Sequence, residues 1–377
     1  MKTKRLIILG FLSALPLHAK GTPPLDPAPQ AKVQIALLLD TSNSMDGLID
    51  QARTQLWKVV NTFVDARRDG EVPFVEVALY EYGNNSLHVA NNYIRQVEPL
   101  TRDLDELSRE LFALKTNGGK EYCGAVIRRA LSDLSWDPAE TTYKVVFIAG
   151  NEPFTQGSVD ARQACKDALA GNIIVNTIHC GGRDEGISGS WHDGAELAEG
   201  KFMIIDQDKA VAHVDAPQDA EIADLSRRLN RTYLGYGANW QASRQNQALA
   251  DKDATANAGA GAEVSRAVTK ASSNYSNTSW DLVDAMREKK VDPAKIPADQ
   301  LPPELRELAP QERVDAVEKA AAERATLQAK ILELNRQREA HAAEQQRQII
   351  AGAQTLDEAL VETTREQAAA LGDRFGN

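Results

Sequence analysis

One carboxylate and two hydroxyls stand at alternate positions just after an apolar run near the start of the chain. The run and its polar end read VQIALLLDTSNSM, from Val33 to Met45, with the polar groups at Asp40, Ser42 and Ser44. On a tight loop their oxygens can converge on one small hard cation, because Mg²⁺ and Ca²⁺ take oxygen ligands. The spacing therefore indicates a divalent-cation site. The alternative is a polar loop in which a serine caps the following helix.

The same three residues stand where an open α/β sheet usually binds its ligands. Residues 33–39 are apolar almost throughout and predict a strand that is buried on both faces. Ligands of such sheets bind beyond the carboxyl ends of the strands. Asp40 follows this strand directly, so we expect it at the ligand-binding edge of the sheet.

Strand and helix patterns alternate along residues 32–240. Apolar runs predict further strands at 74–82, 143–150, 173–181 and 201–206, with an edge strand at 88–97. Apolar residues at three- and four-residue steps predict helices at 46–66, 102–113, 124–134 and 159–170. This alternation predicts the α/β class, with a doubly wound, mainly parallel central sheet and a C-terminal α-helical extension.

The motifs of this stretch resemble those of von Willebrand factor type A domains. Asp-x-Ser-x-Ser is similar to the metal-ion-dependent adhesion site of that family, and the pair Gly118–Gly119, the strand YKVVFIAGNEP, the strand ending in HCGG, and LAEGKFMIID follow in the family's order. Residues 219–237 look like its closing helix. The resemblance implies a Rossmann-like sheet, a bound Mg²⁺, or Ca²⁺ or Mn²⁺ in its place, and a protein partner.

Two positions depart from the family's pattern. The family's threonine ligand after the glycine pair aligns with Glu121, and Thr116 is the alternative ligand. The family's aspartate after the fourth strand falls at Gly150, which leaves Asn151 or Glu152 to take the supporting role. The resemblance therefore implies a metal set of four residues: Asp40, Ser42, Ser44 and Glu121.

Further polar and aromatic residues are expected around this site. Glu81 and Tyr82 end the second strand, and Glu152 follows the fourth. We predict that they form an acidic rim together with a long loop after the fifth strand, because loops on a rigid scaffold often carry recognition. The alternative for each residue is a solvated charged surface. The loop contributes Arg183, Asp184, Glu185, Trp191, His192 and Asp193.

The start of the chain has the pattern of a secretory signal. MKTKRLIILGFLSALPLHA has a basic beginning, an apolar stretch and a small residue at Ala19, after which we expect cleavage. Residues 20–31 form a proline-rich linker. The apolar stretch is too short to span a bilayer comfortably, so we expect a periplasmic or extracellular protein without a membrane span. The formal net charge of -11 argues against nucleic acid as a partner.

Three cysteines are an odd number for an oxidising compartment. Cys123 is expected to open a helix and Cys180 to end a strand at the same end of the sheet. We predict that these two are the closer pair if a disulfide forms. Cys165 is expected within a helix, packed as a small apolar residue.

The chain changes character after residue 240. Residues 241–310 read as an irregular extension and connector, and residues 311–377 as a helical, coiled-coil-like tail. Arg324 interrupts the apolar stripe of this tail. We expect the tail to be separable, so that truncation near residue 245 leaves a folded domain, and to offer a surface for self-association. The stripe consists of Val317, Ala320, Leu327, Ile331 and Leu334.

Three functions compete. The first is a binding protein whose cation keeps one coordination position open for a carboxylate of a partner protein. The second is a structural envelope protein with a decayed metal site that assembles through its helical tail. The third is a cysteine hydrolase that uses Cys123 with Glu121, His179 and His192, but the spacing of these residues establishes no catalytic constellation, so we expect no enzymatic activity.

Overall fold

The computed structural model describes residues 31–206, 215–256, 259–346 and 356–375. The expected signal at 1–19 and all of the linker except its last residue lie outside the described residues. From Ala31 onward the chain forms one compact unit.

A six-stranded sheet with the order β3-β2-β1-β4-β5-β6 forms the centre of this unit. All neighbouring strands run parallel except β3, which pairs antiparallel with β2 at the edge. The doubly wound fold class is therefore confirmed, and the predicted edge strand lies slightly later in the chain than expected. The strands are β1 (Lys32–Asp40), β2 (Phe74–Tyr82), β3 (Ile94–Thr101), β4 (Tyr143–Gly150), β5 (Ile174–Cys180) and β6 (Phe202–Ile205).

Strand β1 lies in the middle of the sheet because both of its faces are apolar. It pairs with β2 on one side and with β4 on the other. Its residues alternate between two apolar clusters: Ile35 and Leu37 belong to one cluster, and Ala36 and Leu38 to the other. This period of two is what a strand with helices on both faces requires.

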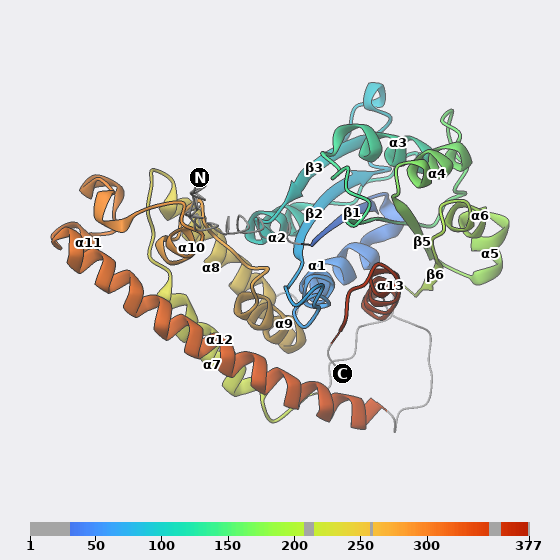
Figure 1. Cartoon of the computed structure of the whole chain (residues 1–377). Helices are drawn as coiled ribbons and strands as arrows, with labels where there is room; N and C mark the ends of the chain where they lie inside the picture. The colour runs from blue at the N-terminus through green and yellow to red at the C-terminus, as the bar shows by residue number, and fades with distance from the viewer. Residues whose placement is uncertain (1–30, 207–214, 257–258, 347–355, 376–377) are drawn as a thin grey trace, which may run out of the picture. The chain divides into compact units, whose positions relative to one another are not determined.

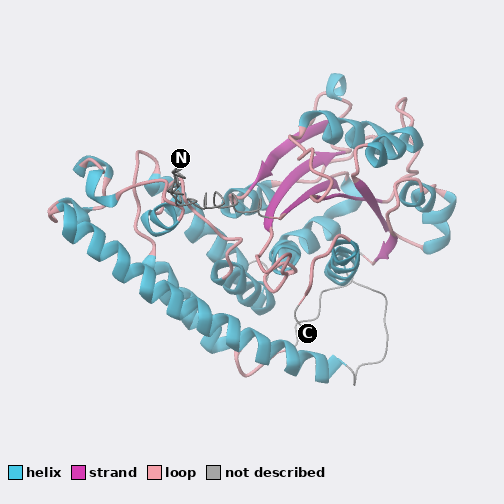
Figure 2. Ribbon diagram, viewed as in Figure 1, coloured by secondary structure: helices cyan, strands magenta, loops and turns pink. Residues whose placement is uncertain are grey.

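Helices cover the two faces of the sheet, as Figures 1 and 2 show. The cluster on one face includes side chains of α1 (Asp46–Asn61) and α2 (Leu104–Ala113). The cluster on the other face includes side chains of α3 (Cys123–Asp133) and α4 (Ala161–Ala170). The predicted helix at 46–66 is shorter than expected, since α1 ends at Asn61.

The sheet has a switch point between β1 and β4. The chain leaves β1 toward α1 on one face and leaves β4 toward α4 on the other, so the two connections diverge. In doubly wound sheets this divergence opens a crevice at the carboxyl ends of the two strands. Asp40 ends β1 at this position.

The helix beside α1 and β6 comes from the end of the chain. It is α13 (Leu356–Ala370), whose Gln367 accepts a hydrogen bond of 2.8 Å from the hydroxyl of Tyr143. The predicted closing helix at 219–237 is instead α7 (Asp219–Leu229), which packs mainly on α9 (Gly259–Ala271) and α12 (Pro310–Gln346). The expectation that residues 219–237 close the sheet is therefore corrected.

The segment expected to be irregular, 241–310, is largely helical. Its main helices are α8 and α9, and a buried ion network ties α9 to α2 and α8. Arg266 lies 2.5 Å from Asp105 and 2.9 Å from Asp251, while Lys270 lies 2.7 Å from Asp251. The sequence predicts only short helices in an irregular extension here, because charged residues occupy buried positions of α8 and α9. The remaining elements here are α8 (Trp240–Ala256), α10 (Leu282–Arg287), α11 (Pro303–Arg306), and the 3₁₀ turns Pro293–Lys295 and Ala298–Gln300.

Arg324 does not interrupt the packing of the long helix α12. Its guanidinium is buried and donates hydrogen bonds to Asp281 at 2.6 Å and to Asp284 at 3.1 Å, and it also donates to the carbonyl of Thr232 at 2.7 Å. Burial of this cation requires such partners. Arg324 therefore continues the buried stripe that Val317 begins, which corrects the sequence interpretation.

The helical tail is not separate from the sheet. Leu327 and Ile331 of α12, and Leu360 and Ala368 of α13, belong to the same apolar cluster as the β1 side chains. The tail therefore packs against the sheet domain, which argues against the expectation that truncation near residue 245 leaves a folded domain. The apolar stripe that was expected to offer a self-association surface is covered by other parts of the chain.

All three cysteines, which lie within the described residues, are free and buried, so the structure does not test the predicted pairing of Cys123 with Cys180 in a disulfide. Cys123 and Cys165 lie in the cluster of α3 and α4, whereas Cys180 lies in the cluster on the opposite face. The sequence places Cys123 and Cys180 at the same end of the sheet, but their side chains belong to the apolar clusters on its two opposite faces.

Candidate metal centre

Asp40 is fully buried at the carboxyl end of β1. Its Oδ1 accepts a hydrogen bond of 2.8 Å from the backbone N–H of Ser42, so the loop folds back onto the carboxylate. Its Oδ2 is buried and has no hydrogen-bond partner within the described residues. A buried charged oxygen without a partner is costly, and metal ligation is one way to satisfy it.

The two serines lie beside this carboxylate. Their hydroxyl oxygens are 3.2 Å apart, and the Ser44 hydroxyl donates to Oδ1 of Asn151 at 3.4 Å. Ser42 precedes a 3₁₀ turn, Asn43–Met45, but its side chain makes no capping hydrogen bond there, and neither does that of Met45 at the start of α1. The hydroxyl of Ser42 therefore does not perform the capping role that was the alternative interpretation of this loop.

Glu121 brings a second carboxylate to the same place. It lies just before α3, is buried, and its backbone N–H donates to Oε1 of Gln156 at 2.8 Å. Gly83, in the loop after β2, lies against both acids: a Cβ there would stand 2.7 Å from Oδ1 of Asp40 and 2.7 Å from Cγ of Glu121. Only glycine at position 83 leaves room for the side chains of Asp40 and Glu121.

Burial and neighbouring carboxylates raise the pKa values of both acids. Burial, with Glu121 and Glu152 as further causes, raises the pKa of Asp40 to about 8. Burial and then Glu152 raise the pKa of Glu121 to about 7. Ser42 lowers both pKa values by hydrogen bonding, but burial outweighs it. Two such acids favour either protons or a cation between them.

The strand β4 does not offer a carboxylate to this site. A Cβ at Gly150 would lie 2.6 Å from the hydroxyl oxygen of Tyr82, 3.2 Å from Oδ2 of Asp40 and 3.2 Å from the indole of Trp191. The Tyr82 hydroxyl is itself held by the carbonyl of Ala149 at 3.0 Å. The space of the family's aspartate is therefore filled, and Glu121 is the carboxylate that joins Asp40.

The other candidate residues take different places. The hydroxyl of Thr116 donates a hydrogen bond to the Asp46 carboxylate at the start of α1. Asn151 is half-buried and contacts Ser44. Glu152 is exposed, and its negative charge helps to raise the pKa of Asp40 and of Glu121. Of the sequence candidates, the structure thus brings together Asp40, Ser42, Ser44 and Glu121, with Asn151 beside them.

The expected acidic and aromatic rim is only partly formed. Tyr82 and Trp191 are buried, and Trp191 donates its indole N–H to the carbonyl of Glu152 at 2.8 Å. The stretch expected as a long loop folds into two short helices, α5 (Arg183–Ser188) and α6 (Trp191–Glu196). Trp191 is therefore buried against Gly150 beside the site rather than on its surface.

The buried cysteines are poorly suited to nucleophilic chemistry. Burial raises the pKa of the Cys123 thiol, whereas a nucleophilic cysteine needs a lowered pKa and access. The rings of His179 and Trp191 contact each other at a tilt, with 5.7 Å between their centroids, and burial lowers the pKa of His179. Within the described residues, the thiol of Cys123 contacts the Tyr82 hydroxyl and the ring of His179 contacts Trp191, so the two do not form a thiol–imidazole pair.

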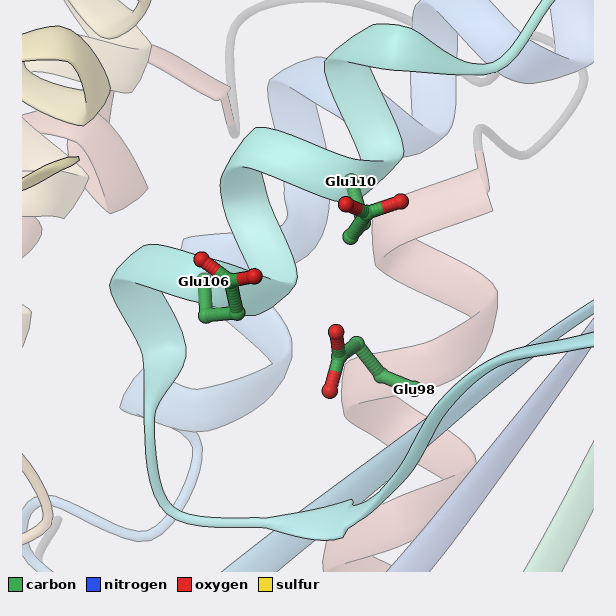
Figure 3. A group of neighbouring side chains, drawn as sticks. All are labelled: Glu98, Glu106 and Glu110. Carbon is green, nitrogen blue, oxygen red and sulfur yellow. The ribbon is translucent and has the colours of Figure 1, made fainter.

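A second acidic cluster, which the sequence analysis missed, lies between β3 and α2. It consists of Glu98, Glu106 and Glu110, all half-buried, as Figure 3 shows. Burial and the other two carboxylates raise the pKa of Glu98. Arg109 forms ion pairs with both Glu106 and Glu110, so part of this negative charge is already compensated within the protein.

Comparison with known proteins gives fold relatives only. No family model matches the chain, and no curated protein matches it. Solved von Willebrand factor type A domains are among the structures that resemble this chain. The SpRpn10 VWA domain has 15% identity and a TM-score of 0.35, and covers 46% of this chain and 88% of its own. BatB from Bacteroides thetaiotaomicron has 15% identity and a TM-score of 0.35, and covers 58% of this chain and 99% of its own.

A third similar structure is proximal thread matrix protein 1 from the mussel byssus. It has 13% identity and a TM-score of 0.35; the match covers 46% of this chain and only 41% of that protein. Because these TM-scores are low, we assign the fold from the strand order and strand pairing described above. No helix in the described part of the chain is long and apolar enough to cross a membrane.

Proposed function

We propose that this chain is a periplasmic or extracellular binding protein of the von Willebrand factor type A kind, which holds one divalent cation at the carboxyl end of β1 and uses it to bind a partner protein. The expected removal of residues 1–19 on secretion belongs to this proposal. Asp40 and Glu121 supply the anionic ligands, and Ser42 and Ser44 supply hydroxyl oxygens.

The observation that carries this proposal is the buried, unpartnered Oδ2 of Asp40 next to a second buried carboxylate. Without a cation, the site holds two acids whose pKa values are raised to about 8 and about 7. With a cation, both become favourable anionic ligands. The all-oxygen donor set suits Mg²⁺ first, and Ca²⁺ or Mn²⁺ as alternatives.

The cation's remaining coordination position is available to a carboxylate of the partner. Two carboxylate ligands already offset most of the charge of a divalent ion, so the attraction to a third carboxylate is weaker than it would be with one neutral ligand in place of Glu121. The site is thus built to hold its metal firmly and its partner loosely. This combination suits reversible association.

Calorimetric titration with Mg²⁺, Ca²⁺ and Mn²⁺ tests the cation site. We expect one site per chain in the wild type, no binding in Asp40→Ala, and weaker binding in Glu121→Thr. Glu98→Gln is the matched control, because it removes a carboxylate from the other acidic cluster and leaves Asp40 untouched. Absence of heat in the wild type at millimolar cation, or equal loss in Glu98→Gln, contradicts the proposal.

Capture of partners from envelope extract tests the binding function. Wild-type protein is immobilised with Mg²⁺ or with chelator, and Asp40→Ala is the negative control. A partner that is retained only by the wild type with Mg²⁺ supports the proposal, and Glu121→Thr is then expected to retain it more strongly. Equal capture by all three samples means that binding does not use the cation.

A further inference from the structure

Thr41 lies between the ligands Asp40 and Ser42 but faces away from the cation site. We infer that Thr41 is the positioning residue of the site, and that Glu81 holds it from the opposite face of the sheet. This inference rests on the proposed cation site. It assigns a role to two buried polar residues that the ligand set does not use.

The alternation of the strands separates these residues from the ligands. Asp40 pairs in register with Tyr82, whose ring lies in the cluster of α3 and α4. Glu81 is the preceding residue of the same strand, so its side chain stands on the other face. Thr41 follows Asp40 and reaches Glu81, which places its hydroxyl on the side of the sheet opposite the carboxylate of Asp40.

Every polar group of Thr41 is bonded. Its hydroxyl donates to Oε2 of Glu81 at 3.1 Å and accepts from the side-chain amide of Asn84 at 3.4 Å. Its backbone N–H donates to the carbonyl of Tyr82 at 2.9 Å, and its carbonyl accepts from the N–H of Asn117 at 3.0 Å. Thr41 is therefore fixed both to the end of β2 and to the segment that leads to Glu121.

The acceptor of Thr41 is itself held in place. Arg95 on the edge strand β3 donates to Oε1 of Glu81 at 2.5 Å, so one oxygen of this carboxylate is turned toward Arg95 and the other toward Thr41. The Glu81 side chain is only 5% exposed, whereas that of Arg95 is 45% exposed. Because the charge of Glu81 is compensated by Arg95, it does not compete with Asp40 for the cation.

Asn84 extends the same arrangement to the neighbouring loop. Its amide donates to the carbonyl of Lys115 at 2.7 Å, and its Oδ1 accepts from the N–H of Ser86 at 2.9 Å. The loop that contains Gly83, which walls both carboxylates, and the segment before Glu121 are thus tied to Thr41. The hydroxyl of Thr41 thus bonds to the end of β2 and to the following loop, and its carbonyl bonds to the segment before Glu121.

Such an arrangement affects affinity because a cation requires its oxygens to be placed in advance. Groups that orient metal ligands through hydrogen bonds typically contribute about 10- to 100-fold in metal affinity. Thr41→Val keeps the branched shape and removes only the hydroxyl. It removes the side-chain bonds of Thr41 to Glu81 and Asn84, while the backbone bonds of residue 41 to Tyr82 and Asn117 remain.

The experiment compares the full chain with Thr41→Val, Thr41→Ser and Thr62→Val. Thr62 is also buried and bonds its hydroxyl locally within α1, to the carbonyl of Lys58, so it controls for loss of a buried hydroxyl. Binding of Mn²⁺ and Mg²⁺ is measured by calorimetry, and amide exchange of Ser42 by nuclear magnetic resonance without metal. Thermal unfolding of each variant is measured in chelator.

We expect Thr41→Val to weaken cation binding by about 10- to 100-fold and Thr41→Ser to bind within about threefold of the wild type. We also expect faster exchange at Ser42 only in Thr41→Val, while Thr62→Val lowers the unfolding temperature without changing affinity. Wild-type affinity in Thr41→Val, or equal loss in Thr62→Val, overturns the inference. If the wild-type protein binds no cation, the proposed function is overturned instead. If, in addition, amide exchange at Ser42 is the same in Thr41→Val as in the wild type, the positioning role of Thr41 is also overturned.

Discussion

Asp40 and Glu121 show at the scale of single residues how a ligand site can oppose folding. In the unfolded chain both acids are in water, whereas the folded chain buries them side by side. Each therefore takes up protons on folding over a range of pH in which the unfolded chain is ionised. A bound cation removes this cost, so metal and folding are coupled.

We predict that the metal-free protein loses stability as the pH rises. Because the pKa of Asp40 is 3.8 in the reference state and about 8 in the fold, the unfolded chain binds fewer protons than the folded chain between these values. Asp40→Asn is expected to flatten this slope and to stabilise the protein at pH 8 in chelator by about 1–3 kcal/mol. Urea unfolding at pH 5 and pH 8 measures the difference. Parallel pH dependence of wild type and variant would contradict it, and added Mg²⁺ should reverse the order.

A second prediction concerns Gly150. Gly150→Asp introduces a carboxylate at the end of β4 but puts a Cβ 2.6 Å from the Tyr82 hydroxyl oxygen. We expect a loss of about 2–4 kcal/mol in stability and no gain in metal affinity. Gly118→Ala is the control, since its nearest neighbour would lie 3.9 Å away. Urea unfolding and calorimetry of both variants test this, and tighter metal binding by Gly150→Asp would show that the site can accept a third acid.

At the scale of elements, the long helix α12 depends on a buried charge. Arg324 is surrounded by Asp281 and Asp284, and its guanidinium lies 4.0 Å from the ring centroid of Tyr233. A helix whose other buried positions are aliphatic is thus joined to α10 through an ion pair rather than through a continuous apolar seam. Its position in the fold is specified by Asp281 and Asp284, which precede Arg324 by 43 and 40 residues in the sequence.

Replacement of this arginine should cost much more than its sequence context indicates. Arg324→Leu completes the apolar stripe but leaves two buried aspartates unpaired, so we expect a loss of about 3–5 kcal/mol. Arg336→Leu, on an exposed part of the same helix, should change stability by less than about 0.5 kcal/mol. Chemical denaturation of both variants measures this. A stable Arg324→Leu would favour the sequence interpretation of Arg324 as an interruption.

At the scale of the whole molecule, the end of the chain completes the unit that its beginning starts. Asp373 forms a buried ion pair with Arg68 at 2.5 Å, and the ring of Phe375 lies 6.1 Å from that of Phe63. Together with Leu360 in the main apolar cluster, these contacts tie the last helix to the segment after α1. The sheet therefore depends on residues far along the chain.

Truncation tests this dependence. A chain that ends near residue 245 lacks α13 and exposes the apolar side chains beneath it, so we expect it to lose fixed tertiary packing. Near-ultraviolet circular dichroism should show a weak signal for the truncated chain and a strong one for the full chain, while far-ultraviolet spectra keep helical character. A folded, monomeric truncated domain would instead show that α12 and α13 add to a sheet that is stable alone.

The sequence by itself determined the local patterns of this protein. The buried strand that ends in Asp40, the alternation of strands with helices, and the long helix at 310–346 all follow from periods of two and 3.6 residues. The position of Asp40, Ser42 and Ser44 at the carboxyl end of β1 followed as well, because strand ends and parallel order fix which edge of the sheet they reach. These properties depend on neighbours in the chain.

Only the tertiary structure decided which distant groups meet. It brought Glu121 against Asp40, filled the space above Gly150 with Tyr82, and buried Trp191. It also gave Arg324 its aspartates and placed α13 beside α1. Local periodicity does not predict these contacts, because each of them joins segments that are far apart in the sequence. The groups become buried together only when the sheet and its helices have packed.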